Sequence, residues 1–200
     1  MAPLPRWAGI DVGARKGFDT AVIDAKRLVA GPKNFTEIED LIGWLRTKRP
    51  RIVAVDSPWS WAPEGELSRQ GERELVRAKV CHVRYTPHHA ALTEKRTTYY
   101  AWIWNGFDLY AALLAANASE GWLPIECFPT ATWSRLGQPR GKRTRARWSS
   151  EVLAGYGLMD LPTRMNQDAR DAIGAAITAR LYDERKTEPF GDIVVPQGQL

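Results

Sequence analysis

Apolar runs that suit buried strands alternate along this chain with stretches of helical periodicity. Residues 7–13 form the first run, which ends at a glycine, and residues 18–24 and 26–35 follow it after short turns. We therefore expect three successive strands near the beginning of the fold. Residues 51–56 are the clearest strand, because Ile, Val, Ala and Val follow one another without a polar residue, as in strands covered on both faces. Residues 123–129 predict a last short strand.

Apolar residues at helical spacing predict the helices between and after these strands. The first helix begins with Thr36 and Glu39 at the spacing of a capping box, and Pro50 ends its pattern. Further helices are expected at residues 66–79, at 98–118, from the basic stretch 140–147 as far as 153, and at 167–184. Small residues would let the last helix lie close to the sheet; they are Ala172, Gly174, Ala175 and Ala176. This order of elements favours an α/β fold in which a mixed sheet carries helices on its faces.

The length and composition are those of one globular domain. A chain of 200 residues, 44% hydrophobic and 26% charged, can bury a self-sufficient core. We expect this domain at residues 7–185 and a loose tail at 186–200. Cys81 and Cys127 lie far apart without metal-ligand spacing, which favours reduced, buried thiols. No apolar stretch is long enough to span a membrane and no signal peptide is evident, so we expect a soluble, cytoplasmic protein.

Charge and aromatic content leave the partner open. The net charge of +5 draws the protein toward polyanions, but many basic proteins bind nothing acidic. Most of the nine tryptophans are expected to fill the core, while some could face a groove and stack on bases. A protein partner is the alternative for the exposed aromatic surface that could be formed by Trp59, Trp61, Trp102 and Trp104.

Five acidic residues occupy positions where a buried side chain is expected. Asp11 and Glu126 interrupt apolar runs, Asp56 ends one, and Asp168 and Asp171 lie three apart on the last predicted helix. Acids are rarely buried without a partner. Each position also has an ordinary structural explanation. Asp11 and Asp56 could stand in tight turns, and Glu126 could point to solvent from an edge strand. Asp168 and Asp171 lie in the first turn of a helix, where the helix dipole favours negative charge.

The motifs around these acids resemble one known family. They resemble, in order and spacing, the domain of unknown function 429 family, which is regarded as predicted nucleases of the RuvC and ribonuclease H-like class. The resemblance covers roughly residues 7 to 183, and its motifs are Gly9-Ile10-Asp11-Val12-Gly13, Val55-Asp56-Ser57-Pro58, Gly106-Phe107-Asp108-Leu109-Tyr110, Ile125-Glu126-Cys127-Phe128-Pro129 and Asp168-Ala169-Arg170-Asp171-Ala172.

The resemblance implies a ribonuclease H-like fold with a mixed five-stranded sheet flanked by helices and a helical insertion between strands 4 and 5, at about 60–118. In that fold class, acids on the first strand, at the end of the fourth strand and on the last helix bind catalytic metal, which implies Asp11, Asp56 and Asp171. Asp168 resembles the paired helix carboxylates of RuvC-type enzymes, and Glu126 matches the family's own strand motif as a further ligand. The chain departs from RuvC in having Asp where RuvC has Glu on the fourth strand, and in a longer segment from 57 to 118.

Converging carboxylates require a cation. Two of them about 4 Å apart repel by roughly 4 kcal/mol at an effective dielectric near 20. Their oxygens suit Mg²⁺ or Mn²⁺, and two such ions can catalyse displacement at a phosphodiester. We therefore predict a metal-dependent nuclease acting on DNA or RNA. Its catalytic acids are Asp11, Asp56, Glu126 and Asp171, and Asp168 joins them as a metal ligand.

Basic and imidazole side chains complete the expected site. Phosphate contacts are predicted for Arg69, Arg73, Lys142, Arg143, Arg145 and Arg147, although a solvated helix face explains them equally well. The histidines could move protons but are also ordinary loop residues; they are His82, His88 and His89.

Two other functions fit parts of the sequence. An actin-like ATPase shares Asp-x-Gly on its first strand but needs two such domains and a glycine-rich adenosine site. A non-catalytic nucleic-acid- or protein-binding module that retains the fold is the second alternative. RuvC-type relatives that act on branched DNA are dimers, so a homodimer is left open.

Overall fold

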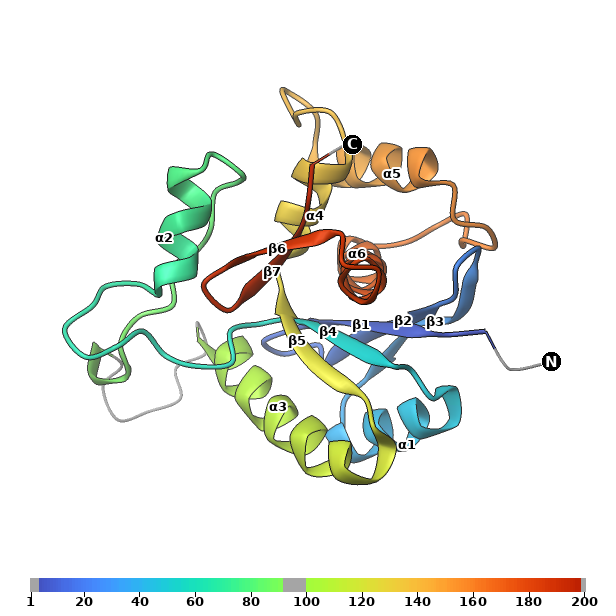
Figure 1. Cartoon of the computed structure of the whole chain (residues 1–200), viewed down its shortest axis with the longest axis horizontal. Coiled ribbons are helices and arrows are strands. Elements are labelled where there is room, and N and C mark those ends of the chain that lie inside the picture. Colours follow the sequence, from blue (N-terminus) through green and yellow to red (C-terminus); the bar gives the residue numbers. More distant parts are fainter. Residues whose placement is uncertain (1–3, 92–99, 199–200) are drawn as a thin grey trace.

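A seven-stranded mixed sheet forms the centre of the protein, in the strand order β3-β2-β1-β4-β5-β7-β6 (Figure 1). The structure is a computed structural model that describes residues 4–91 and 100–198. The four central strands β1, β4, β5 and β7 run parallel, and the outer strands pair antiparallel. The strands are β1 (Trp7–Val12), β2 (Phe18–Ile23), β3 (Leu28–Phe35), β4 (Ile52–Asp56), β5 (Leu123–Cys127), β6 (Thr187–Phe190) and β7 (Ile193–Pro196).

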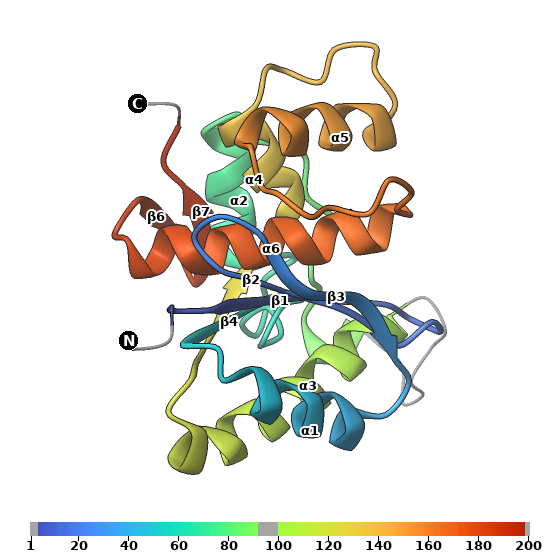
Figure 2. The same cartoon turned by 90° about the vertical axis from the view of Figure 1, so that its right-hand side faces the viewer.

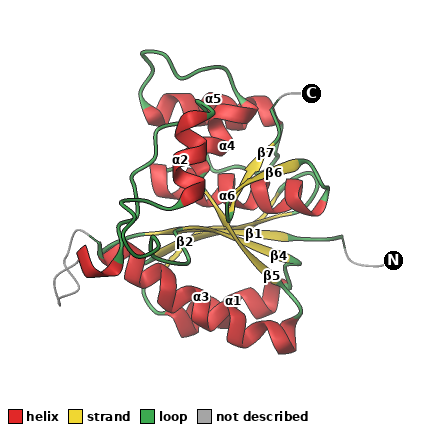
Figure 3. Ribbon diagram, turned by 60° about the vertical axis from the view of Figure 1, so that its left-hand side comes forward, coloured by secondary structure: helices red, strands yellow, loops and turns green. Residues whose placement is uncertain are grey.

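Helices cover both faces of this sheet. They are α1 (Ile38–Lys48), α2 (Gln70–Arg77), α3 (Ala101–Glu120), α4 (Pro129–Leu136), α5 (Arg145–Tyr156) and α6 (Gln167–Asp183), with a short 3-10 turn η1 (His89–Ala91). Helices α1 and α3 lie on one face and α6 lies on the other, with α4 and α5 beyond it (Figures 2 and 3). In the described part of the chain, none of the helices has the length and apolar character needed to cross a bilayer.

The predicted strands and helices are present, with differences at several ends. Helix α1 begins at Ile38, and its N-cap Glu37 makes no side-chain cap, so the predicted capping box is wrong. Helix α3 continues to Glu120, where Gly121 in the left-handed conformation ends it. The predicted start of this helix, at 98–99, lies outside the described residues. The unpredicted helix α4 has Pro129 in its first turn, where a missing N–H is harmless.

The C-terminal segment is not a loose tail, and the sheet has seven strands instead of the predicted five. Strands β6 and β7 form a hairpin, and β7 pairs parallel with β5. Burial of Ile193 and Val195 stabilises this hairpin, and Pro189 is tolerated because β6 is an edge strand. The hairpin also holds α2: the backbone of Gly71 lies against the Phe190 carbonyl, where a Cβ would approach its oxygen to 2.1 Å.

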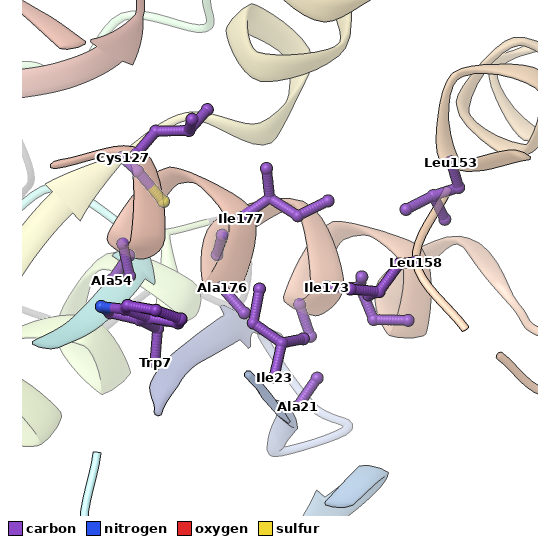
Figure 4. Packing of buried hydrophobic residues seen from close by; sticks show 14 of the residues in the cluster. Trp7, Ala21, Ile23, Ala54, Cys127, Leu153, Leu158, Ile173, Ala176 and Ile177 are labelled. Atoms are coloured by element: carbon purple, nitrogen blue, oxygen red, sulfur yellow. The ribbon is translucent and has the colours of Figure 1, made fainter. Parts of the chain in front are cut away.

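Close packing of α6 on β1 is the central contact of the fold. A Cβ on Gly9 would lie 2.1 Å from the backbone oxygen of Ala172 and 2.1 Å from the nitrogen of Ala176. Of the small residues predicted to allow this approach, Ala172, Ala175 and Ala176 lie at the contact with Gly9, whereas Gly174 faces the Trp133 ring. Around them a large apolar cluster joins α6 to β1, β2, β4 and α5 (Figure 4).

The strand register carries the acids to this same face. In the parallel pair of β1 and β4, Asp11 lies opposite Asp56 and Gly9 lies opposite Ala54. Because side chains alternate along a strand, both Asp side chains share the face on which α6 packs. The approach of α6 therefore decides how close its own acids come to the strand ends.

We predict that Gly9→Ala destabilises the fold strongly, because the added methyl group meets helix backbone that cannot rotate away. The expected loss is about 3 kcal/mol of unfolding free energy. Gly43→Ala is the matched control, since Gly43 is exposed in α1 with nothing within 4 Å of its Cβ position. This control should gain about 0.5–1 kcal/mol in helix propensity. Urea unfolding of both variants measures the difference, and equal stability would contradict the packing described.

Candidate active site

Four of the five predicted acids line one pocket of about 620 Å³ at the ends of β1 and β4 and the beginning of α6. They are Asp11, Asp56, Asp168 and Asp171. These residues lie far apart in the sequence, and three different elements carry them. The fold therefore gathers most of the acids that the sequence singled out.

Asp11 and Asp56 form a hydrogen-bonded carboxyl pair at the base of the pocket. Burial, followed by the charges of Asp56 and Asp171, raises the pKa of Asp11 well above its ordinary value. Burial and the charge of Asp171 raise the pKa of Asp56 to about 7, although Arg145 opposes this. The pair is therefore stable when Asp11 keeps its proton and donates it to the Asp56 carboxylate.

Asp171 is held from both sides. Its Oδ1 accepts hydrogen bonds from Trp133 Nε1 and Gln167 Nε2, each at 2.9 Å. Its Oδ2 lies 2.9 Å from Arg145 Nη2. The side chain is 3% exposed, and burial raises its pKa while Arg145 and the two donors limit the rise. One turn earlier, Asp168 Oδ2 lies 3.3 Å from Lys16 Nζ, a more exposed contact.

Glu126 does not reach this pocket. Its two oxygens each lie 2.7 Å from a terminal nitrogen of Arg69, and Oε2 also accepts the backbone N–H of Trp59 at 3.3 Å. Both side chains of the pair are only 6% exposed. The structure therefore engages the Glu126 carboxylate with Arg69 instead of bringing it to the other four acids, so a metal-ligand role for Glu126 and a phosphate contact for Arg69 stay predictions.

Of the six predicted phosphate contacts, only Arg145 lines the pocket. Arg73 pairs with Glu66, while Arg143 and Arg147 both pair with Glu151 on the outer surface of α5. Lys142 is exposed in the turn before that helix. The solvated-face explanation therefore fits most of this basic stretch.

The pocket holds two arginines that the sequence did not assign and one of its three candidate histidines. Arg84 and Arg140 line it, and so does His82, whereas His88 and His89 do not. His89 instead packs among aromatic rings, with its ring centroid 5.6 Å from that of Trp61. The irregular segment at 81–88 has no periodicity, so only its path across the pocket reveals these residues.

The tryptophans divide between core and surface. Trp7, Trp122, Trp133 and Trp148 are buried, as expected, and Trp59 is 50% exposed. Trp61 and Trp104 form an edge contact with ring centroids 5.1 Å apart. Trp102 lines the acidic pocket, and its buried Nε1 has no hydrogen-bond partner within the described structure.

The donor set has the chemistry of a Mg²⁺ or Mn²⁺ site. Its ligand atoms are carboxylate oxygens, which these hard cations prefer. Among residues 4–91 and 100–198, however, no three acidic, His or Cys side chains are drawn into a coordination sphere. Two cationic contacts offset part of the acidic charge: Lys16 on Asp168 and Arg145 on Asp171. The residues fit these ions in kind, and four of them line the same pocket.

Comparison with solved structures shows the fold class. RuvC of T. thermophilus, in complex with a Holliday junction substrate, matches with a TM-score of 0.50 and 17% identity over 96% of this chain and 99% of that chain. The structure of Thermus thermophilus RuvC matches with a TM-score of 0.48 and 19% identity over the same shares. The yeast mitochondrial Holliday junction resolvase Ydc2 matches with a TM-score of 0.48 and 15% identity over 87% of this chain and 77% of that chain. The first likeness shows a ribonuclease H-like fold.

The family follows from the sequence comparison. No curated protein matches the chain. The sequence model of the family described as "protein of unknown function (DUF429)" matches residues 9–192, which spans all the motifs around the acids. The chain therefore belongs to the DUF429 family, as its motifs predicted.

Proposed function

We propose that this protein is a metal-dependent nuclease that hydrolyses phosphodiester bonds of DNA or RNA. Its metal ligands are Asp11, Asp56, Asp168 and Asp171. The observation that carries the proposal is that these acids, from two parallel strands and one helix, line a single pocket together with Arg145. RuvC from T. thermophilus is described with a Holliday junction, so branched DNA is among the substrates to test.

Electrostatics supports a divalent cation at the acids. Burial and mutual repulsion make the ionised carboxyls of Asp11 and Asp56 unfavourable, which raises both pKa values. A divalent cation relieves the same repulsion without a proton. Two bound Mg²⁺ or Mn²⁺ ions would supply Lewis-acid activation of water and stabilise both the attacking and the leaving oxygen of the phosphodiester.

The protein itself orients the ligands. Trp133 and Gln167 fix Oδ1 of Asp171 and leave Oδ2 toward the pocket, as outer partners of metal ligands commonly do. Gly174 leaves room for the Trp133 ring beside Asp171, because a Cβ on Gly174 would lie 2.4 Å from that ring. Arg140 and Arg145 place positive charge at the same pocket, where a phosphate would enter.

Glu126 and Arg69 have a supporting role in this proposal. Their buried ion pair joins the segment after β4 to the end of β5. Glu72 extends the connection, because its carboxylate accepts the backbone N–H of Thr86 at 3.0 Å. The segment so held then carries His82 and Arg84 along the pocket wall.

We predict that Asp11→Asn and Asp171→Asn lose nuclease activity while remaining folded. The loss should exceed about 100-fold, since removing even an outer partner of a ligand costs 10–100-fold. Cleavage of four-way junctions, single- and double-stranded DNA and RNA in Mg²⁺ or Mn²⁺ measures it. Absence of all cleavage by the wild type, with no Mn²⁺-induced rise in melting temperature, would favour the non-catalytic module instead.

The pH dependence of metal-free stability should reflect Asp56. Because its pKa rises to about 7 from an ordinary 3.8, the folded protein keeps a proton that the unfolded chain releases. Unfolding free energy should therefore fall as the pH rises between these values, by up to about 1.4 kcal/mol per pH unit for this proton and as much again for the proton on Asp11, whose pKa is raised too. Urea unfolding in EDTA should show this decline in the wild type and a weaker one in Asp56→Asn. The same decline with pH in the wild type and in Asp56→Asn would contradict the contribution of Asp56.

Breaking the buried ion pair should destabilise the fold. Arg69→Met leaves Glu126 charged and buried, at a cost of about 3–5 kcal/mol. The double variant Arg69→Met with Glu126→Gln should recover part of this, since neither side chain is then charged. Arg73→Met, four residues along in α2, is the control: it removes a partly exposed pair with Glu66 and a hydrogen bond to the Ser68 carbonyl, at an expected cost of about 1–2 kcal/mol. Chemical denaturation of the wild type and of the three variants gives the unfolding free energies. An equal loss in Arg69→Met and Arg73→Met would contradict the special contribution of the buried pair.

A further inference from the structure

Arg145 contacts the one oxygen of Asp171 that Trp133 and Gln167 leave without a hydrogen bond, and both Arg145 and Asp171 line the pocket. Oδ1 of this carboxylate already accepts two hydrogen bonds, from Trp133 and Gln167. Oδ2 is left for a cation, and Arg145 Nη2 lies 2.9 Å from it. A divalent ion that binds Asp171 on the pocket side must therefore compete with this guanidinium.

The contact of Arg145 is built differently from the permanent ion pair nearby. Arg69 donates to both carboxylate oxygens of Glu126 through two nitrogens, and both side chains are 6% exposed. Arg145 meets Asp171 through one nitrogen, and its own side chain is 41% exposed. Its Nε is buried without a hydrogen-bond partner in the described structure. One donor of the Arg145 guanidinium thus has no acceptor in this position, and the side chain is exposed enough to adopt another.

Unpaired donors in this pocket point to an oxygen-rich anion. Besides Arg145 Nε, the indole Nε1 of Trp102 is buried without a partner, and both residues line the pocket. Buried N–H groups without acceptors are unusual, because each costs about 1–3 kcal/mol. Non-bridging oxygens of a phosphodiester would supply acceptors to both, close to the acids.

We propose, on the basis of the proposed function, that Arg145 is an exchangeable counter-ion: it neutralises Asp171 at rest, gives up Oδ2 to the divalent cation, and then binds the substrate phosphate. Metal and nucleic acid consequently bind with positive coupling, because the metal releases the guanidinium that the phosphate needs. Arg145 thereby opposes metal binding in the absence of substrate. If the residue merely oriented Asp171, its removal would weaken metal binding instead.

The test measures Mn²⁺ affinity by calorimetry in the whole protein without nucleic acid. Arg145→Ala should bind Mn²⁺ about tenfold more tightly than the wild type, since a charge-assisted contact no longer competes. Arg145→Lys keeps the charge and should stay close to the wild type. Arg147→Ala is the matched control, because Arg147 lies on the same helix but pairs with Glu151 on the outer surface.

A second measurement follows binding of a fluorescent single-stranded oligodeoxynucleotide by anisotropy in Ca²⁺. Arg145→Ala should bind it about tenfold more weakly, as expected for loss of a charged phosphate contact. Arg147→Ala should change this affinity less than twofold.

The outcomes separate this inference from the proposed function. Unchanged or weaker Mn²⁺ binding by a folded Arg145→Ala would overturn the exchange and leave the metal site standing. A rise in Arg145→Lys equal to that in Arg145→Ala would also overturn it. If Arg145→Ala failed to fold by circular dichroism, Arg145→Gln would decide on the same criteria. No Mn²⁺ binding by the wild type or any variant would overturn both proposals.

Discussion

Backbone contact between α6 and β1 is the constraint on which the acidic pocket depends. At Gly9 the strand offers no side chain, so the helix rests directly on it at Ala172 and Ala176. The same approach brings Asp171 to the ends of the two strands that carry Asp11 and Asp56. A helix one side chain farther out would separate Asp171 from Asp11 and Asp56 and weaken the repulsion by which it raises their pKa values. Packing in the apolar core thus determines the electrostatics of the surface pocket.

Two kinds of cationic contact then serve different purposes around these acids. The pair of Arg69 and Glu126 is buried and fully bonded, and it fixes the path of the segment after β4. Arg145 and Lys16 make single, partly exposed contacts with the helical acids. The first kind stabilises the frame of the site, and the second can be exchanged. The distinction follows from geometry and burial, since all of these residues carry the same unit charge.

The sequence revealed the features that local pattern encodes. Apolar runs located β1 to β5, and acids in or at the end of two of these runs pointed to Asp11 and Asp56, because a buried charge is costly wherever it occurs. The family motif on the last helix added Asp168 and Asp171. Pairing between distant residues was not visible. Nothing near Glu126 indicates that Arg69, 57 positions earlier, neutralises it, and Arg69 has the same helical spacing as the exposed Arg73. The hairpin of β6 and β7 was missed because Pro189 and Gly191 suggest a break, while its stability comes from pairing with β5.

The hairpin also bears on how the chain can fold as the ribosome makes it. Strand β7 lies between β5 and β6, and the hairpin supports α2 at Gly71. The segment that carries Arg69 and one wall of the pocket is therefore synthesised early but gains the support of the hairpin only after residue 196 has emerged. Until then β5 exposes an open edge on the nascent chain, where another strand could pair. Completion of the pocket thus waits for the hairpin to be synthesised, which delays any activity until the sheet is closed.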